Sequence, residues 1–129
     1  MSLFDLLKKR RSEGITWTIR TASRETVVTA EGFYALIDDA LTAVEEGYTE
    51  FLVLSPSMPV GGVTFLQVCG DDEEGLMHIE AGTEKFMANG RVNILARDGI
   101  TTGEALDLFT RFFEGSKVDI AGWQTLETE

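Results

Sequence analysis

The sequence predicts an α+β fold, with an antiparallel sheet of five or six strands and two main helices packed on one face of it. Two long segments, 30–46 and 102–114, carry apolar residues at helical spacing. The other apolar segments are short and mostly follow one another along the chain, as the strands of an antiparallel sheet do. With 129 residues, the chain has the length of one domain.

Residues 1–13 predict a short, basic, amphipathic helix ahead of a single acidic domain over 14–129. Ser2 and Asp5 resemble a capping box, and Leu3, Leu6 and Leu7 form one apolar side. Four cations, Lys8, Lys9, Arg10 and Arg11, fall in the last turn, where the helix dipole favours positive charge. A helix of about ten residues is marginal alone. We therefore expect it to pack on its own domain, on a partner or on a membrane surface.

The first strand is predicted over 15–21, because apolar and polar residues alternate there. Ile15, Trp17 and Ile19 share one face, whereas Thr16, Thr18 and Arg20 share the other. Residues 25–29 are expected to be its hairpin partner. The helix over 30–46 follows, with Thr29 as its N-cap and Gly47 just beyond its end.

In the second half of the chain, four short apolar segments are predicted to be strands, and a second helix follows them. Residues 50–54, 63–69, 76–81 and 91–97 are expected strands, and 55–62 a loop with both prolines. Asn89-Gly90 favours a hairpin turn, and a short helix over 83–88 is the alternative. A capping box of Thr101 and Glu104 begins the helix over 102–114. Residues 118–126 are expected to pack back on the sheet.

The charge is divided unevenly along the chain, whose net charge is −11. Residues 1–11 contain four bases and one acid, which gives +3, whereas the remainder contains 21 acids and seven bases, which gives −14. The negative charge of residues 12–129 disfavours binding to nucleic-acid phosphate, because such binding depends on Lys and Arg. It favours a basic partner. Asp71, Asp72, Glu73 and Glu74, with Glu45 and Glu46, are the candidate contact surface for that partner.

Polar residues in apolar strands form a second candidate site. His78, the only histidine, is expected on the same strand face as Glu80, with Gln67 and the single cysteine, Cys69, on the neighbouring strand. One interpretation is a groove on the uncovered sheet face that binds a small molecule, or a Cys–His nucleophile pair. The other is ordinary strand alternation beside a small buried thiol.

Other classes of site find no support in the sequence. One His and one Cys cannot supply an ordinary zinc site, and 71–74 lacks the ligand order of an EF-hand. We therefore expect no metal and no cofactor. The lone cysteine, the lack of an apolar run of about 18 residues and the lack of a secretory signal predict a cytoplasmic protein.

Residues 63–126 resemble small acidic bacterial immunity-type domains. The matching elements are Phe65-Leu66-Gln67, His78-Ile79-Glu80, the helix from Glu104 to Phe109, and Trp123. The resemblance implies a non-enzymatic, cytoplasmic protein-interaction domain, and some such domains cover the active site of a toxin. The alternatives are a small-molecule binder or enzyme using Gln67, His78 and Glu80, and a membrane adaptor using residues 1–11. The oligomeric state is left open.

Overall fold

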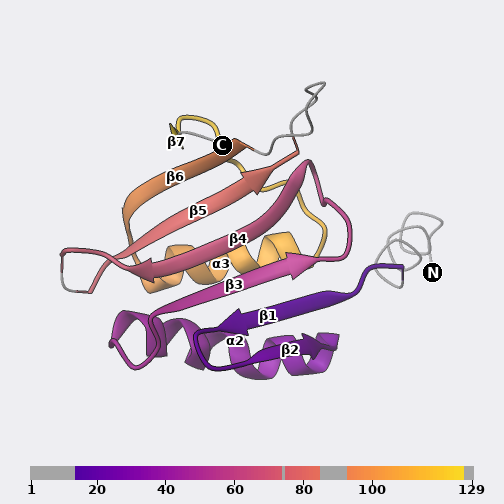
Figure 1. Ribbon diagram of the computed structural model, residues 1–129, viewed down its shortest axis with the longest axis horizontal. Helices are drawn as coiled ribbons and strands as arrows, with labels where there is room; N and C mark the ends of the chain where they lie inside the picture. Colours follow the sequence, from indigo (N-terminus) through magenta and orange to yellow (C-terminus); the bar gives the residue numbers. More distant parts are fainter. Residues whose placement is uncertain (1–13, 74, 85–92, 127–129) are drawn as a thin grey trace.

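Seven strands form one antiparallel sheet in the computed structural model, which describes residues 14–73, 75–84 and 93–126 (Figure 1). The strand order is β2-β1-β3-β4-β5-β6-β7. The strands are β1 (Trp17–Thr21), β2 (Glu25–Val28), β3 (Phe51–Pro56), β4 (Val63–Gly70), β5 (Met77–Thr83), β6 (Asn93–Ile100) and β7 (Gln124–Leu126). The expected helix over 1–13 and the Asn89-Gly90 turn lie outside the described residues. Of the alternative helix over 83–88, only 83 and 84 are described, and Thr83 is the last residue of β5.

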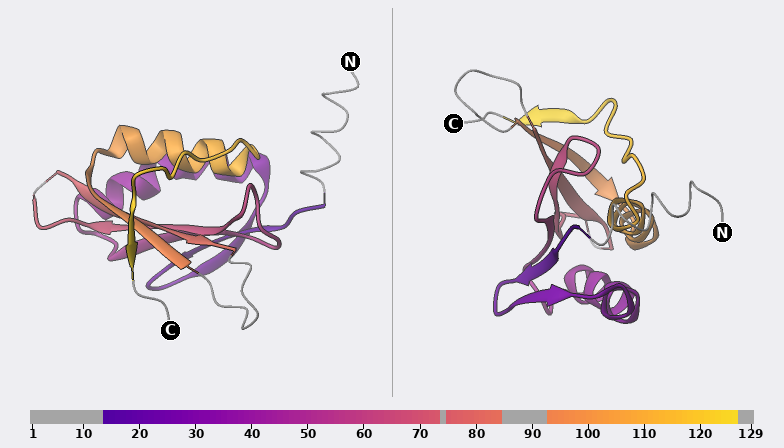
Figure 2. Two further views of the ribbon diagram at one scale, coloured as in Figure 1. Left: turned by 90° about the horizontal axis from the view of Figure 1, so that it is seen from above. Right: turned by 90° about the vertical axis from the view of Figure 1, so that its right-hand side faces the viewer.

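Two helices, α2 (Ala30–Glu45) and α3 (Thr102–Phe113), lie on the same face of the sheet (Figure 2). The Thr29 side chain accepts a hydrogen bond from the Gly32 amide at the start of α2, and the Thr101–Glu104 capping box is formed at the start of α3. Gly47 and Gly115, just beyond the two helix ends, have φ of 83° and 80°, which glycine adopts without strain. The predicted α+β class, helices, caps and one-sided packing are confirmed.

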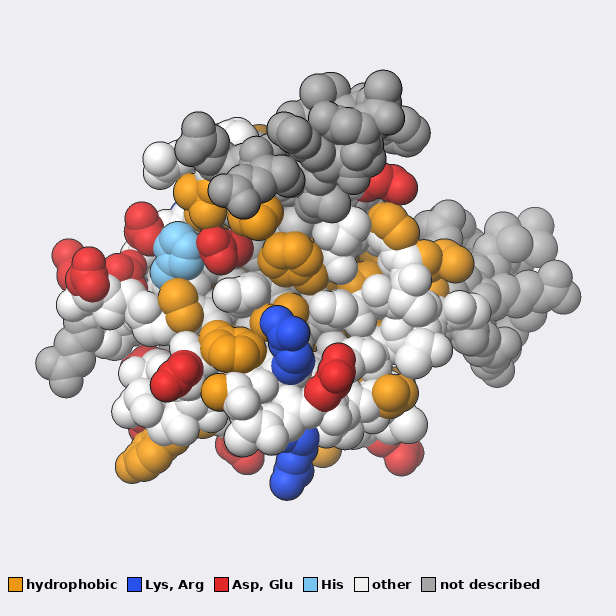
Figure 3. Space-filling view, in the orientation of Figure 1, with side chains coloured by type: hydrophobic (Ala, Val, Ile, Leu, Met, Phe, Trp, Pro, Cys, Tyr) orange, Lys and Arg blue, Asp and Glu red, His pale blue; other side chains and the backbone are white. Residues whose placement is uncertain are grey.

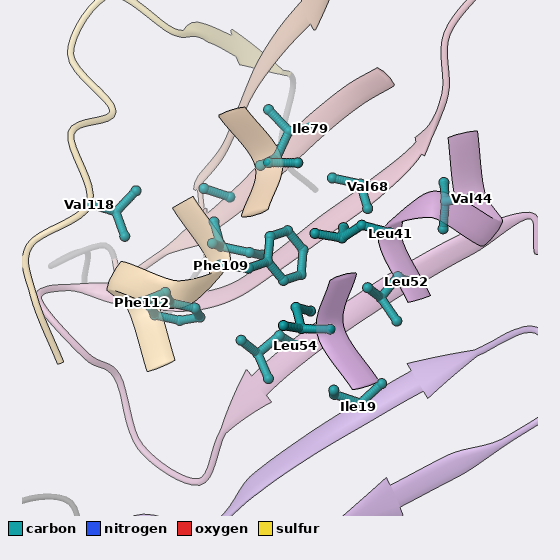
Figure 4. Close-up of a cluster of buried hydrophobic side chains, with 14 of the residues drawn as sticks. Ile19, Leu41, Val44, Leu52, Leu54, Val68, Ile79, Phe109, Phe112 and Val118 are labelled. Atoms are coloured by element: carbon teal, nitrogen blue, oxygen red, sulfur yellow. The ribbon is translucent and has the colours of Figure 1, made fainter. Parts of the chain in front are cut away.

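The hydrophobic core fills the space between this face and the helices (Figure 4). The sheet contributes Ile19, Leu52, Leu54, Val68 and Ile79, and the helices contribute Leu41, Val44, Phe109 and Phe112. Burying a side chain of this size stabilises the fold by about 1.5–3 kcal/mol before entropy is counted. An aromatic contact joins the helices, because the Phe33 and Phe113 rings stack with centroids 4.0 Å apart.

Most elements differ from the expected bounds by one or two residues, and three differences change the pairing of the sheet. The sheet has a seventh strand, β7, because Gln124–Leu126 pairs with Ile94–Ala96 at the edge. β3 continues through Ser55 and Pro56, since both pair with β1. β6 extends to Ile100, which pairs with Met77. In each case pairing with a neighbouring strand decides the boundary.

Among the described residues, no helix is both long enough and apolar enough to cross a membrane.

Candidate functional site

The face of the sheet away from the helices carries the candidate site around His78 and is seen head-on in Figure 3. Because side chains alternate along a strand, every second residue points to this open face. On this face, one row of residues crosses all seven strands, and each residue in it is the cross-strand partner of the next. It consists of Glu25, Arg20, Val53, Gln67, Glu80, Ala96 and Gln124.

The residues that the sequence analysis grouped on the sheet do come together. Gln67 of β4 pairs with Glu80 of β5, and Cys69 pairs with His78 two residues along. All four are partly buried rather than fully exposed. The expectation that His78 and Glu80 share a face is therefore confirmed, with Gln67 and Cys69 as their cross-strand neighbours.

His78 lies between two carboxylates. Its Nδ1 is 2.5 Å from Asp98 Oδ1, and its Nε2 is 3.7 Å from Glu80 Oε1. Burial lowers the pKa of His78, but the hydrogen bond to Asp98 and the negative charges of Asp98 and Glu80 outweigh it, so the net pKa is raised. Asp98 was missed because the sequence analysis ended this strand at 97. The alternation of Ala96 with Asp98 is the signal that could have found it.

Cys69 sits in surroundings that oppose the Cys–His nucleophile interpretation. Burial raises the pKa of the Cys69 thiol, and the negative charges of Glu80, Asp71 and Asp98 raise it further. A nucleophilic cysteine requires the opposite, because the thiolate is the reactive form. Burial and the nearby carboxylates therefore favour the protonated thiol over the thiolate.

The predicted acidic residues gather at one end of the sheet, around the corner between β6 and α3. The Thr102 hydroxyl donates to Glu45 at the end of α2, and the Gly99 amide donates to Asp71 Oδ2 (2.8 Å) in the β4–β5 turn. Three segments, 45–50, 70–73 and 98–104, thus share this end of the molecule, where carboxylates are prominent in Figure 3. Their acidic residues are Glu45, Glu46, Glu50, Asp71, Asp72, Glu73, Asp98 and Glu104.

These segments, which we term the acidic end, contain no Lys or Arg. Arg97, directly before them, is 3.3 Å from Glu104. Tyr48 also lies here, with 82% of its surface exposed. Of the predicted set, Glu45 and Asp71 are engaged in holding the corner together, whereas Glu46, Asp72 and Glu73 are exposed. Glu74 and the four cations at Lys8, Lys9, Arg10 and Arg11 lie outside the described residues.

A hollow of about 400 Å³ opens on the same face over β1, β3 and β4. Its lining residues are Thr16, Thr18, Arg20, Glu25, Val53, Ser55, Pro56, Ser57, Phe65 and Gln67. Gln67 is the one lining residue that was predicted as a site residue from the sequence. The others were missed because the hollow forms only when β1 pairs with β3, a long-range contact that local alternation does not indicate.

In the described part of the chain, no group of three or more His, Cys, Asp or Glu side chains is arranged to hold a metal ion. No protein-family model, curated protein or solved structure matches the chain. The resemblance to immunity-type domains thus stays a hypothesis drawn from residues 63–126.

Proposed function

We propose that this chain is a protein-interaction module whose acidic end binds a basic partner protein. The observation that carries the proposal is the convergence of three separate segments, all acidic and without Lys or Arg, on the β6–α3 corner. Local concentration of one charge sign speeds the encounter with an oppositely charged partner.

The exposed ring of Tyr48 supports a protein as the partner. Tyrosine is enriched among residues that dominate interface energetics, because it offers a large rigid surface with one polar group. A Tyr that is 82% exposed among Glu46 and Glu50 could pack against the stem of a partner's Arg or Lys. Within this proposal, the resemblance to immunity-type domains suggests a basic toxin as the class of partner.

The test compares two double charge reversals in the full chain. Asp72→Lys with Glu73→Lys alters the acidic end, whereas Asp38→Lys with Asp39→Lys alters an equally exposed adjacent pair on α2. Each immobilised protein is exposed to lysate of the native host and eluted with a salt gradient. The retained protein is then identified and purified, and its Kd is measured for each variant.

We expect a basic protein whose Kd rises about tenfold with the reversal at 72 and 73 and hardly changes with the reversal at 38 and 39. Its association rate should fall as salt screens the charges. Equal loss of binding in both variants would show that only the total charge matters and not the acidic end, which would contradict the proposal. An acidic partner, or no retained protein, would also refute it.

A further inference from the structure

The hollow on β1, β3 and β4 has the size and lining of a small-ligand site. Its volume of about 400 Å³ falls in the range of pockets for small molecules, roughly 300–1,000 Å³. The floor is apolar, because Val53 is 94% buried and the Phe65 side chain lies against Gly82 of the next strand. A Cβ on Gly82 would lie 2.2 Å from the Phe65 ring, which is a steric clash. The position of the Phe65 ring therefore requires glycine at 82.

Two opposite charges occupy facing positions at this hollow, and among the described residues they form no ion pair with each other. Arg20 and Glu25 are direct cross-strand partners. The ion pairs of the described residues nevertheless involve Arg97, Arg111 and His78, and not Arg20 or Glu25. The Arg20 guanidinium lies over the Phe51 ring, 5.8 Å from its centroid, on the open face.

The remaining lining consists of uncharged hydrogen-bonding groups. Thr18 and Ser55 contribute hydroxyls, and Gln67 contributes an amide. The Ser57 hydroxyl oxygen accepts a hydrogen bond from the Thr16 amide (2.9 Å), which fixes the rim of the hollow next to β1. The site therefore offers one cation, one anion and neutral polar groups above an apolar floor.

We propose that this hollow binds a free α-amino acid with an apolar side chain. Arg20 holds the ligand carboxylate, Glu25 holds its ammonium group, and the side chain packs on Val53 and Phe65. A simple anion is disfavoured, because Glu25 stands beside Arg20 and residues 12–129 carry a net charge of −14. A zwitterion avoids that cost, since it has no net charge and supplies a partner to each side chain. This inference does not rest on the proposed function, because the acidic end is built from other segments.

The test is a titration of the ¹⁵N-labelled full chain with L-leucine and L-phenylalanine, followed through backbone amide shifts. The comparison ligands are 4-methylpentanoate and 3-phenylpropanoate, which lack the ammonium group, and 3-methylbutylamine and 2-phenylethylamine, which lack the carboxylate. Arg20→Met and Glu25→Gln remove one charge each. Arg24→Met removes a cation from the β1–β2 turn, outside the lining, and serves as the matched control.

We expect saturable shifts at amides of Thr18, Val53, Ser55 and Gln67 with at least one amino acid, and about tenfold weaker binding of the analogues that lack either charge. Arg20→Met and Glu25→Gln should each weaken binding to a similar degree, whereas Arg24→Met should leave it unchanged. Equal binding of the carboxylate-only analogues, binding that survives both substitutions, or no shifts at about 10 mM ligand would overturn the proposal.

Discussion

At the scale of single residues, His78 is the titratable side chain whose surroundings are most clearly arranged. Asp98 and Glu80 flank its two ring nitrogens, and the imidazolium form gains more from them than it loses by partial burial. In its imidazolium form the ring therefore links β5 to β6 on the open face, beside the acidic end.

This geometry predicts how stability depends on pH. Because the folded-state pKa of His78 is raised above its ordinary value of 6.5, its stabilising effect is fully present below pH 6.5 and is lost as the pH rises through the raised value. Urea unfolding of the wild type between pH 5.5 and 9 should show that loss. Asp98→Asn should diminish it, because the substitution removes the principal carboxylate partner.

The matched control for this prediction is Asp72→Asn, an exposed carboxylate of the neighbouring turn. It should retain the pH dependence of the wild type. NMR titration of the imidazole provides the direct readout, and a His78 pKa at or below 6.5 in the wild type would contradict the account.

Of the site around His78, the sequence predicted only the neighbours that follow from alternation along a strand and from the order of consecutive strands. Period-2 alternation placed His78 and Glu80 on one face, and the order of the strands placed Gln67 and Cys69 beside them. Arg20 could not be placed beside Gln67 in this way, because that neighbourhood depends on the pairing of β1 with β3, which are not consecutive strands. Asp98 was missed for a different reason, since the predicted strand ended at 97, one residue before it.

At the scale of secondary-structure elements, the helices are determined mainly by signals within their own segments. The Thr101 hydroxyl accepts from the Glu104 amide, and the Glu104 carboxylate accepts from the Thr101 amide, at 3.1 and 3.2 Å. These two contacts satisfy amides that otherwise have no partner at a helix start. Such contacts connect residues three positions apart, which is why both helix starts were predictable.

Thr101→Ala should lower the free energy of unfolding by about 1 kcal/mol, because it removes the hydroxyl that caps α3. Urea denaturation should show a lower midpoint with an unchanged m-value. Ser116→Ala, at an exposed position just beyond α3, is the control and should shift the free energy by less than about 0.5 kcal/mol. Equal midpoints for Thr101→Ala and the wild type would show that the cap contributes nothing.

The strands were less predictable at their ends. β7 is only three residues long, too short to show alternation, and it exists because Thr125 lies opposite Leu95 of β6. β3 was expected to stop before Ser55 and Pro56, since proline lacks an amide proton. It continues because the neighbouring Ser57 amide donates to the Thr16 carbonyl (2.8 Å) and extends the pairing with β1.

At the scale of the whole molecule, the one-sided packing of α2 and α3 leaves the opposite sheet face open and brings the acidic segments to one end (Figures 1 and 2). The sequence predicted the one-sided packing and the excess of acid. It could not show that Glu45 and Asp71, 26 positions apart in sequence, bond to the same β6–α3 corner. That convergence is a consequence of the strand order, and it is the basis of the proposed partner-binding surface.

Whether the acidic end is the contact surface can be determined by mapping backbone amide shifts of the ¹⁵N-labelled full chain on addition of the purified basic partner. The perturbed amides should cluster in 45–50, 70–73 and 98–104, with Tyr48 among them, and the shifts should diminish as salt is added. Perturbation centred on the outer face of α2 around Asp38 and Asp39, with the acidic end unaffected, would contradict the proposal.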